Sequence, residues 1–219
     1  MAKIILFGTG DIAQIANYYF DIDSEHEVVA FTVNESYITE NTFEGRPLVS
    51  FENIESKYPP SEYKMFIALS YSSMNKVREQ KYYEAKKKGY ELISYISSKC
   101  TYLSQFKTGD NCFIFEDNTI QPFVKIGNNV TMWSGNHIGH HSIIDSHNFI
   151  SSHVVISGHC NIESYCFVGV NSTLAHNVTL AKETLIGAGA IVTKNTEPAS
   201  VHVPAKSIIL EKKSFEFKL

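Results

Sequence analysis

The feature that most constrains this chain is a six-residue period of apolar residues in its second half. Every sixth residue from Ile126 to Val192 is aliphatic or methionine, and no position in the series is polar. Such a period is typical of a hexapeptide-repeat parallel β-helix, in which each repeat forms one short strand and a corner, and stacked coils bury a continuous core. The same phase extends back to Ile96, so we expect an uninterrupted solenoid over residues 96–195.

The cysteines follow the same phase. Cys100, Cys112, Cys160 and Cys166 each fall four residues after a position of the six-residue series, extended back to Ile96. A single repeat position that takes thiols and small or β-branched residues points toward the interior. We therefore predict that the four thiols are core residues and not metal ligands or disulfide partners.

The first part of the chain has a different pattern. A short apolar run over residues 3–7 ends in Gly8-Thr9-Gly10-Asp11, helical spacing follows over residues 12–20, and a β-branched run covers residues 27–33. This order predicts a βαβ unit with a variant of the glycine-rich nucleotide fingerprint, whose glycines let the backbone approach a pyrophosphate. Asn34 follows the second run where a dinucleotide site would have an acid, so NAD is not the expected ligand.

A third buried run ends at Ser70, and a helix then ends at Gly89. We expect a Rossmann-like α/β domain over residues 1–95, the solenoid over residues 96–195 and a C-terminal tail over residues 196–219. The repeat phase is already running at Ile96, so no linker is expected between the first two.

Composition excludes several functional classes. The 219 residues are 43% hydrophobic and 19% charged, with a formal net charge of −4, so the chain offers no basic surface for nucleic acid. Its apolar runs are too short for a signal peptide or a membrane span. We therefore expect a cytoplasmic protein that neither binds nucleic acid nor inserts into a membrane.

A glycine recurs directly after the apolar position, at Gly127, Gly139, Gly169 and Gly187. In this form the solenoid resembles the left-handed β-helix acyltransferases. With the glycine-rich first domain and the terminal Val203-Pro204-Ala205-Lys206, the chain is similar to the sialic acid O-acetyltransferase-like sugar O-acyltransferases, and within them to bacterial nucleotide-4-amino-sugar N-acetyltransferases. The resemblance implies a homotrimer with active sites between subunits, acetyl-CoA as co-substrate and no metal cofactor.

The resemblance also implies a general base, the histidine of an Ile-x-His sequence, which here is His140. Imidazole suits this role because its pKa near 6.5 lets it accept a proton at neutral pH. The alternative for each histidine between His137 and His159 is a solvent-facing corner residue. Six histidines within these 23 residues, in a chain of nine, favour a polar site. His137 is the second candidate for the base.

Counting by coils gives His140 a partner. Three hexapeptides make one coil, so Gly158 lies one coil above His140, and the resemblance implies that its backbone N–H binds the acetyl carbonyl. His141 stands where many relatives have an acid, and we expect it to take part in catalysis. Trp133 stands where relatives have a small polar residue, and it either stacks on a sugar face or packs between subunits.

The resemblance divides the ligand contacts between the two domains. The nucleotide sugar is expected at Gly8, Thr9, Gly10, Asp11, Asn34, Ser70, Trp133 and His137. Acetyl-CoA is expected along the solenoid at Gly158, Gly187 and Ala188 and in the tail at Pro204 and Lys206. The glycines allow the pantetheine to approach closely, and the lysine suits a CoA phosphate.

The predicted function is acetyl transfer from acetyl-CoA to the 4-amino group of a nucleotide-linked (UDP, dTDP or GDP) amino-deoxy sugar in bacterial surface-glycan biosynthesis. One alternative keeps the fold and donor but acetylates a sugar hydroxyl, as sialic acid O-acetyltransferases do. An alternative of another class is a non-catalytic nucleotide-sugar-binding or zinc-binding hexapeptide-repeat protein. The grouping of His137, His140, His141 and His159 keeps zinc binding open.

Overall fold

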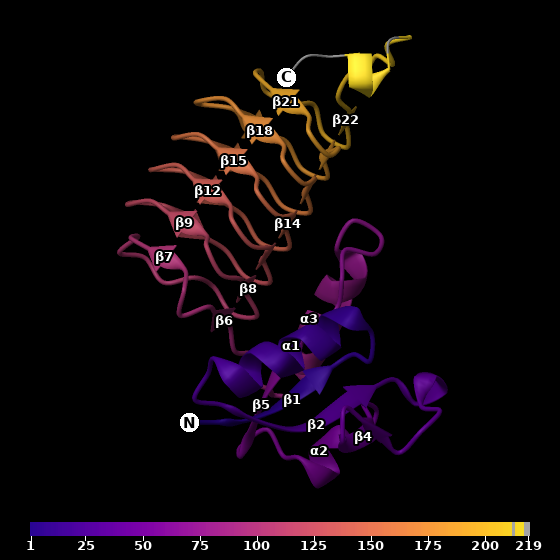
Figure 1. Cartoon of the computed structure of the whole chain (residues 1–219). Helices are drawn as coiled ribbons and strands as arrows, with labels where there is room; N and C mark the ends of the chain where they lie inside the picture. The colour runs from indigo at the N-terminus through magenta and orange to yellow at the C-terminus, as the bar shows by residue number, and fades with distance from the viewer. Residues whose placement is uncertain (212, 217–219) are drawn as a thin grey trace.

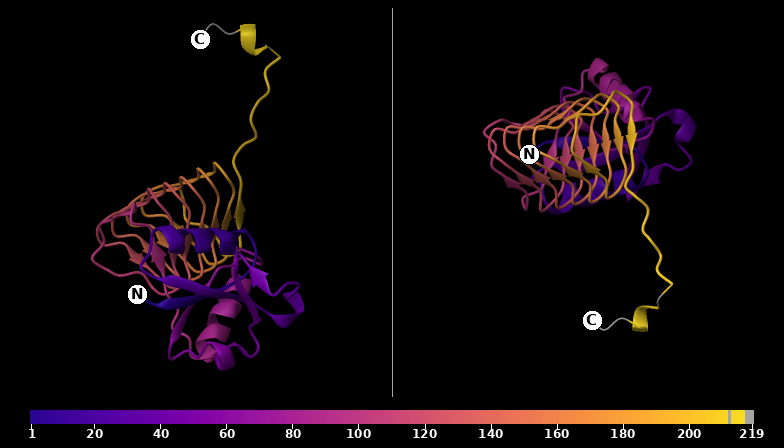
Figure 2. Two further views of the ribbon diagram at one scale, coloured as in Figure 1. Left: turned by 60° about the horizontal axis from the view of Figure 1, so that its bottom comes forward. Right: turned by 90° about the horizontal axis from the view of Figure 1, so that it is seen from above.

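The computed structural model describes residues 1–211 and 213–216 of the chain. An N-terminal α/β domain lies against a solenoid of stacked coils, and a C-terminal segment leaves the last coil (Figure 1). This segment runs away from both domains, as two further views show (Figure 2). Among the described residues, no helix is long and apolar enough to span a membrane.

The N-terminal domain is a five-stranded sheet with helices on both faces. Its strands lie in the order β3-β4-β2-β1-β5, all parallel except β3. The elements are β1 (Lys3–Phe7), α1 (Asp11–Ile22), β2 (Glu27–Val33), the 3₁₀ helix η1 (Glu35–Tyr37), β3 (Thr42–Phe43), β4 (Arg46–Ser50), α2 (Ile54–Lys57), β5 (Tyr63–Ile67) and α3 (Lys76–Lys87). The predicted βαβ unit is therefore present.

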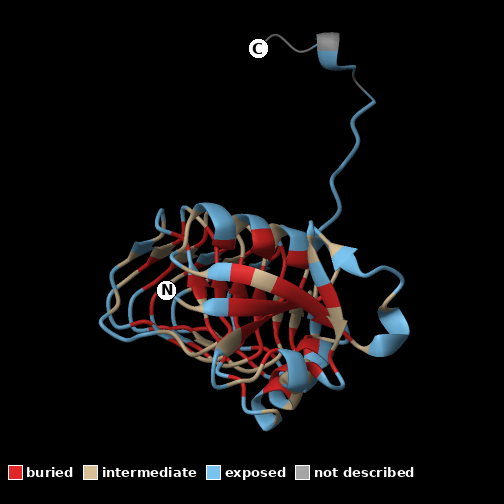
Figure 3. Ribbon diagram, turned by 90° about the horizontal axis from the view of Figure 1, so that it is seen from below, coloured by how far each residue is buried: buried red, intermediate tan, exposed pale blue. Residues whose placement is uncertain are grey.

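Alternation along β1 shows how the sheet is buried. Ile4 and Leu6 pack with α1 and with the first strands of the solenoid, whereas Ile5 and Phe7 pack with α2 and α3. Both faces of the central strands are thus covered, as is usual for a parallel sheet. In Figure 3 these strands are buried along most of their length, while the C-terminal segment is exposed.

The solenoid is built from two-residue strands in three parallel sheets. The strands are β6 (Tyr95–Ile96), β7 (Thr101–Tyr102), β8 (Phe113–Ile114), β9 (Thr119–Ile120), β10 (Lys125–Ile126), β11 (Thr131–Met132), β12 (His137–Ile138), β13 (Ile143–Ile144), β14 (Phe149–Ile150), β15 (Val155–Ile156), β16 (Asn161–Ile162), β17 (Phe167–Val168), β18 (Thr173–Leu174), β19 (Thr179–Leu180), β20 (Leu185–Ile186), β21 (Ile191–Val192) and β22 (Val201–His202). Paired strands lie eighteen residues apart, for example Lys125 opposite Ile143, which confirms three hexapeptides per coil.

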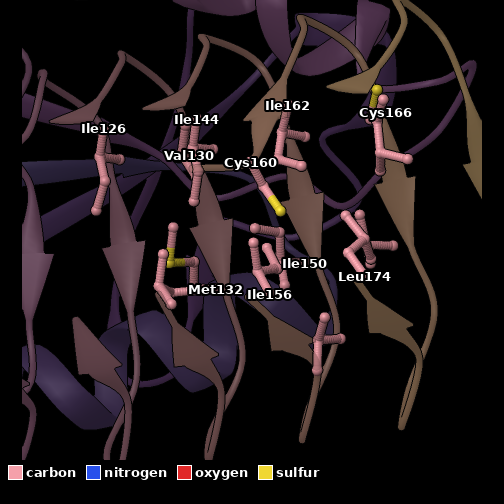
Figure 4. Close-up of a cluster of buried hydrophobic side chains, with 14 of the residues drawn as sticks. Ile126, Val130, Met132, Ile144, Ile150, Ile156, Cys160, Ile162, Cys166 and Leu174 are labelled. Atoms are coloured by element: carbon pink, nitrogen blue, oxygen red, sulfur yellow. The ribbon is translucent and has the colours of Figure 1, made fainter. Parts of the chain in front are cut away.

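From β8 to β21 the second residue of each strand points inward and is buried. The whole apolar series from Ile126 to Val192 is buried, and these side chains stack in columns inside the prism (Figure 4). Cys112, Cys160 and Cys166 are buried in the same core, and Cys100 packs partly buried against it. Burial of one such aliphatic side chain contributes about 1.5–3 kcal/mol, so the solenoid is stabilised along its whole length.

The two ends of the solenoid depart from the predicted repeat. No strand is described at Thr108, although the Gly109 N–H still donates to the Ile126 carbonyl at 3.0 Å. At the other end, β22 pairs with β20, with His202 opposite Ile186, sixteen residues away instead of eighteen. The last coil is therefore shortened by two residues and extends beyond the predicted end at residue 195.

Three sheets make a triangular prism, and its faces and corners are named here by what covers them. The seven-stranded sheet (β22-β20-β17-β14-β11-β8-β6) is the docked face, because the N-terminal domain lies on it. The α1 corner comprises residues 115–118, 133–136, 151–154, 169–172 and 187–190. The α3 corner comprises residues 127–130, 145–148, 163–166 and 181–184. The opposite corner, between the six- and four-stranded sheets, comprises residues 121–124, 139–142, 157–160 and 175–178.

Each corner contains one residue with a left-handed backbone. From Asn111 to Glu183 this corner slot recurs every six residues, with φ between 52° and 77°. The slot favours glycine, asparagine, aspartate and histidine over other residues. His141, His147, His153 and His159 all occupy it, at φ of 57° to 65°. The corner slot thus accounts for these four histidines, but His147 is buried and not solvent-facing. His140 lies outside the slot.

Candidate active site

Two adjoining cavities open at the carboxyl ends of β1, β2 and β5, where ligands bind in open parallel sheets. The glycine-loop cavity has a volume of about 440 Å³, and its lining includes Gly8, Thr9, Gly10 and Asn34. The Trp133 cavity, also about 440 Å³, is lined by Gly10, Asp11, Ser70, Tyr71 and Trp133, among others. All predicted nucleotide-sugar residues except His137 thus line one cavity or the other.

The glycine turn has two different physical requirements. Gly8 has φ of 130°, and a Cβ there would lie 2.7 Å from the Ala68 carbonyl oxygen, so only glycine lets the turn approach β5. Gly10 caps the N-terminus of α1 with an extended backbone, and a Cβ there would meet no atom within 4 Å. Packing therefore does not require glycine at position 10. Without a side chain, this residue leaves the mouth of the cavity open.

An acid that sequence reasoning missed lies beside the glycine-loop cavity. The Asn34 side-chain amide donates to a Glu52 carboxylate oxygen at 2.8 Å, and the Ser50 hydroxyl donates to the other oxygen at 2.6 Å. These hydrogen bonds, from Ser50 first and Asn34 second, lower the pKa of Glu52 to about 2. The expected acid after the second strand is thus replaced by a carboxylate after β4.

Helix α3 contributes residues that sequence reasoning also missed. Val77, Gln80 and Lys81 line the glycine-loop cavity, together with Tyr37 from η1. The Lys81 ammonium lies 5.6 Å from the Phe7 ring centroid and donates to Glu84 at 2.6 Å. These residues share no motif with the glycine turn, because the packing of α3 against β5 alone brings them there.

Trp133 joins the N-terminal domain to the solenoid. Its ring is half-buried, packs against Phe115 at a centroid distance of 4.9 Å and lines the cavity that also contains Asp11 and Ser70. Its buried indole N–H has no hydrogen-bond partner among the described residues. The ring is thus held in place by aromatic packing within one chain.

At the opposite corner, the His140 ring lies directly over Gly158. A Cβ on Gly158 would lie 2.8 Å from both Cε1 and Nε2 of His140. The backbone of the two coils is joined there by the His159 N–H, which donates to the His140 carbonyl at 2.9 Å. The imidazole is exposed, so the eighteen-residue spacing brings together an accessible ring and a bare stretch of backbone.

Among the described residues, the backbone N–H of Gly158 has no hydrogen-bond acceptor, and the cause is Gly139 on the adjacent coil. One coil earlier, the His140 N–H donates to the Gln121 side chain at 2.8 Å. The corresponding residue for Gly158 is Gly139, which has no side chain, and a Cβ on it would lie 2.4 Å from the Gly158 nitrogen. Within residues 1–211 and 213–216, the Gly158 N–H donates to no acceptor.

His141 contacts His140 through nitrogen. The two Nδ1 atoms lie 3.0 Å apart, so one of them donates a hydrogen bond and the other accepts it. The His141 ring stacks on that of His159, at 4.8 Å with an interplanar angle of 7°, and contacts the Phe123 ring at 4.5 Å with a tilt of 31°. Residues 123, 141 and 159 hold successive corner slots, so the column of rings follows from the coil repeat.

A further histidine that sequence reasoning missed completes this group. The His176 ring lies 5.3 Å from the His159 ring and 6.3 Å from the His140 ring. Desolvation, and then the neighbouring His141, His140 and His176, lower the pKa of His159. His176 lies thirty-six residues after His140, and because Gly158 between them has no side chain, the two rings approach each other.

His137 lies elsewhere. It is half-buried in β12, where it pairs with Thr119 and Val155 in the six-stranded sheet. Among the described residues, its ring makes no aromatic contact with the four rings of the opposite corner. The predictions that His137 binds substrate or serves as the second candidate base gain no geometric support in a single chain.

The residues predicted to bind acetyl-CoA are spread along the solenoid end. Gly187 and Ala188 lie in the α1 corner, and the Gly187 N–H donates to the His202 carbonyl of β22 at 2.7 Å. Pro204 and Lys206 follow β22 in the exposed C-terminal segment. Within one chain, only Gly158 of the predicted CoA residues lies beside His140.

The two halves of the candidate site are separated within one chain. The Trp133 cavity lies between the N-terminal domain and Trp133 at the α1 corner, and the glycine-loop cavity adjoins it within the N-terminal domain. His140 and Gly158 lie at the corner opposite the docked face. In a triangular prism, the corner between two faces is the one farthest from the third, so the body of the solenoid lies between the cavities and the histidine group.

No family model matches the chain, and no curated protein matches it. Several solved structures do match the chain in fold. The acetyltransferase domain of PglB from Neisseria gonorrhoeae has a TM-score of 0.81 at 16% identity, covering 95% of this chain and 100% of that one. WeeI from Acinetobacter baumannii has a TM-score of 0.78 at 18% identity, with 93% and 97% covered.

PerB from Caulobacter crescentus, solved with CoA and GDP-perosamine, has a TM-score of 0.63 at 15% identity, covering 93% of this chain and 95% of that one. These likenesses extend over both domains. At such low identity they establish the fold, and the predicted fold class, a Rossmann-like domain followed by a left-handed β-helix, is confirmed.

Proposed function

We propose that this protein is an acyl-CoA-dependent N-acetyltransferase that transfers acetyl from acetyl-CoA to the 4-amino group of a nucleotide-linked amino-deoxy sugar. The observation that carries the proposal is the exposed His140 ring over the free Gly158 N–H. An accessible base next to an unused backbone donor matches the two demands of acyl transfer to an amine, which are proton removal and oxyanion stabilisation.

His140 is the general base in this proposal. The amine loses a proton as its nitrogen bonds to the thioester carbon, and the Nε2 of His140 accepts that proton. The carbonyl electrons move to oxygen, then return as the carbon–sulfur bond breaks, and the CoA thiolate takes up a proton. Such a base contributes about 10²- to 10⁴-fold to the rate.

Gly158 is the oxyanion donor. Its N–H has no acceptor within the described part of the chain, and the absence of a side chain on Gly139 keeps the approach to it open. A fixed backbone donor of this kind contributes about 10²- to 10³-fold, because it needs no reorganisation during the reaction. Gly139 is thus as necessary to the donor as Gly158 itself.

His141 is assigned to orienting His140. With one proton between the two Nδ1 atoms at 3.0 Å, the productive arrangement has the His140 Nδ1–H donating to a neutral His141. The Nε2 of His140 then carries the free electron pair. The neutral imidazole thereby takes the place of the acid that such sites often use, and the Phe123 ring, 4.5 Å away, packs against it.

The acceptor's nucleotide is assigned to the glycine-loop cavity and its sugar to the adjoining Trp133 cavity. Gly8, Thr9 and Gly10 present backbone at the N-terminus of α1, a position suited to phosphate oxygens. The Lys81 ammonium lies across the same cavity. PerB, similar in fold, was solved with a GDP-linked sugar, so a nucleoside diphosphate sugar is the expected class, with UDP, dTDP and GDP as candidates.

The separation of cavities and histidines requires a second copy of the chain. We propose a homotrimer, in which the opposite corner of one solenoid meets the Trp133 cavity of its neighbour. The C-terminal segment supports this arrangement: Ile208 and Ile209 are 87% and 94% exposed, and the segment runs away from its own solenoid (Figure 2). Packing against a neighbour would cover these residues and bring Pro204 and Lys206 to the donor.

A thiol-release assay tests the proposed function. The purified protein is given acetyl-CoA with 4-amino sugars linked to UDP, dTDP or GDP, and in parallel with sialic acids. Release of CoA thiol with the amino sugars only, and a product heavier by one acetyl group, is expected. Turnover with hydroxyl acceptors only would contradict N-acetylation in favour of O-acetylation, and no turnover with either would contradict the enzyme assignment. We place the reaction in the cytoplasm, where both substrates are made.

A further inference from the structure

The histidine group at the opposite corner has more ligand atoms than acyl transfer requires. His140, His141 and His159 each place a ring nitrogen so that the three atoms lie within 4.8 Å of one another. His176 adds a fourth ring 5.3 Å from that of His159. The proposed transfer uses one of these rings as base and one as its partner, which leaves His159 and His176 without a role.

The corner slot does not account for the group. It explains His141 and His159 individually, because histidine tolerates a left-handed backbone. His147 and His153 occupy the same slot at the other two corners, and there each histidine lies without a second histidine ring beside it among the described residues. His140 and His176 are outside the slot, so four rings converge at one corner for a reason other than backbone conformation.

The geometry matches a transition-metal site. Zinc–nitrogen bonds of 2.0–2.1 Å at a tetrahedral ion place two ligand nitrogens about 3.4 Å apart, and the Nδ1 atoms of His140 and His141 are 3.0 Å apart. The remaining pairs must close by little more than an ångström, which exposed rings can do by rotating. Imidazole nitrogens select zinc, copper, nickel or cobalt over magnesium and calcium.

We propose that His140, His141 and His159 bind one divalent transition-metal ion such as Zn²⁺, with His176 available as a fourth ligand. The bound ion takes the one free electron pair of the neutral His140 imidazole, so the other ring nitrogen carries the proton and the ring can no longer act as a base. Where the protein catalyses acetyl transfer, metal binding therefore inhibits it, and this consequence rests on the proposed function. The metal acts here as a reversible inhibitor and not as a cofactor.

Direct binding to the full chain, stripped with a chelator and dialysed, tests the site without any substrate. Titration with Co²⁺ is followed by visible absorption, and titration with Zn²⁺ by calorimetry. We expect one ion per chain and absorption bands of cobalt with nitrogen ligands, which Zn²⁺ abolishes. Absence of both bands and heat, or a stoichiometry far below one, would overturn the proposal.

Matched variants identify the ligands. His159→Asn keeps a residue suited to the slot, as Asn171 and Asn177 show, and removes one ligand, so metal affinity should fall at least about tenfold. His153→Asn makes the same change at the α1 corner and should leave affinity unchanged. Equal affinity in wild type and His159→Asn, or equal losses in both variants, would refute the assignment.

Activity provides a separate readout. Without metal, His159→Asn should turn over like the wild type, and it should require at least about ten times more Zn²⁺ for half-inhibition. If no acceptor supports turnover, the proposed function fails while cobalt binding still decides the site. If turnover is normal and cobalt does not bind, the metal proposal alone fails.

Discussion

Two corners of one solenoid have the same histidine in the same backbone slot and use it differently. At the α3 corner, His147 is buried beneath α3, where Asn129 contacts its Nδ1 at 2.9 Å and the rings of Tyr82 and Tyr165 pack on it. At the opposite corner, His141 is exposed and contacts His140. The repeat fixes the backbone position of each histidine. The element that covers the corner determines whether the imidazole is buried in a structural contact or exposed and available for chemistry.

The covering element at the α3 corner is held by Arg78. This residue is 1% exposed, and its guanidinium donates to Asn129 Oδ1 at 3.1 Å and to the carbonyls of Asn129 and Asn148 at 3.2 Å and 3.0 Å. Burial is the main reason that its pKa is lowered to about 10. The slot histidine is thus structural at the α3 corner, where α3 covers it, and available for chemistry at the opposite corner, where it is exposed.

The largest expected effect is at the exposed corner. His140→Ala should lower kcat at least about 10²-fold, because it removes the general base, while thermal stability and oligomeric state stay unchanged. His147→Asn, the same kind of loss at the covered corner, should keep turnover within about threefold. Initial rates and size-exclusion chromatography measure both. Near-normal turnover of His140→Ala would erase the distinction between the corners.

Gly158→Ala should have the next largest effect. The backbone at Gly158 is outside the left-handed region, but the new Cβ would lie 2.8 Å from two atoms of the His140 ring. Displacement of the ring by about 1 Å should cost up to about 10²-fold in kcat. In the His140→Ala background the same substitution should cost little more, since the ring is gone. Additive losses in the double variant would argue against this contact.

At the covered corner, Arg78→Met should affect stability instead of chemistry. The substitution leaves the buried Asn129 carbonyl oxygen without its donor, while the Asn148 carbonyl keeps the Thr131 N–H at 3.1 Å. This loss should cost about 1–3 kcal/mol of unfolding free energy. Urea denaturation followed by far-UV circular dichroism measures this loss. The Michaelis constant for the nucleotide sugar should rise with the loosened domain more than kcat falls. Wild-type stability would show that α3 is held by other contacts.

The smallest expected effect is a pH dependence at His147. Burial lowers its pKa, Glu79 at 3.8 Å and Asp110 oppose the shift, and Arg78 adds to it. A histidine with a lowered pKa binds fewer protons folded than unfolded, so its contribution to stability is present above about pH 6.5 and is lost as the pH falls below that value. Tyr82, Tyr83 and Tyr165 also face the ring.

His147→Asn therefore should lose less melting temperature than the wild type between pH 7.5 and pH 5.5. Asparagine suits the slot, so the variant should remain folded at both values. Differential scanning fluorimetry across this range measures the difference. Parallel pH curves for the two proteins would mean that His147 is not the buried group that titrates.

The solenoid could be predicted from the sequence because its core depends on a local repeat. Every sixth residue faces inward, and eighteen-residue arithmetic alone brings His140 over Gly158. The same arithmetic extended by one more coil would have found His176. The shortened last coil could not be predicted, because β22 pairs with β20 without continuing the period.

The residues that line the glycine-loop cavity were predicted only in part. The glycine turn lies at the cavity because strand, turn and helix are consecutive in the chain. Gln80, Lys81 and Glu52 were missed because α3 and β4 reach the cavity through tertiary packing, which leaves no spacing rule in the sequence. How the N-terminal domain docks depends on buried polar contacts such as those of Arg78, and these are formed across 51 or more residues.

The central claim, that nucleotide cavity and histidine corner come from different chains, is tested most directly by complementation. Gly10→Val should fold, because a Cβ there meets no atom within 4 Å, and its side chain should block the cavities. This variant and His140→Ala are each expected to be inactive alone. Co-expressed with different tags and purified as mixed trimers, they should regain roughly a third of wild-type activity, since every mixed trimer joins an intact corner to an intact cavity at one of its three sites. Mixed trimers as inactive as either parent would contradict the account, because a site within one chain always carries one of the two defects.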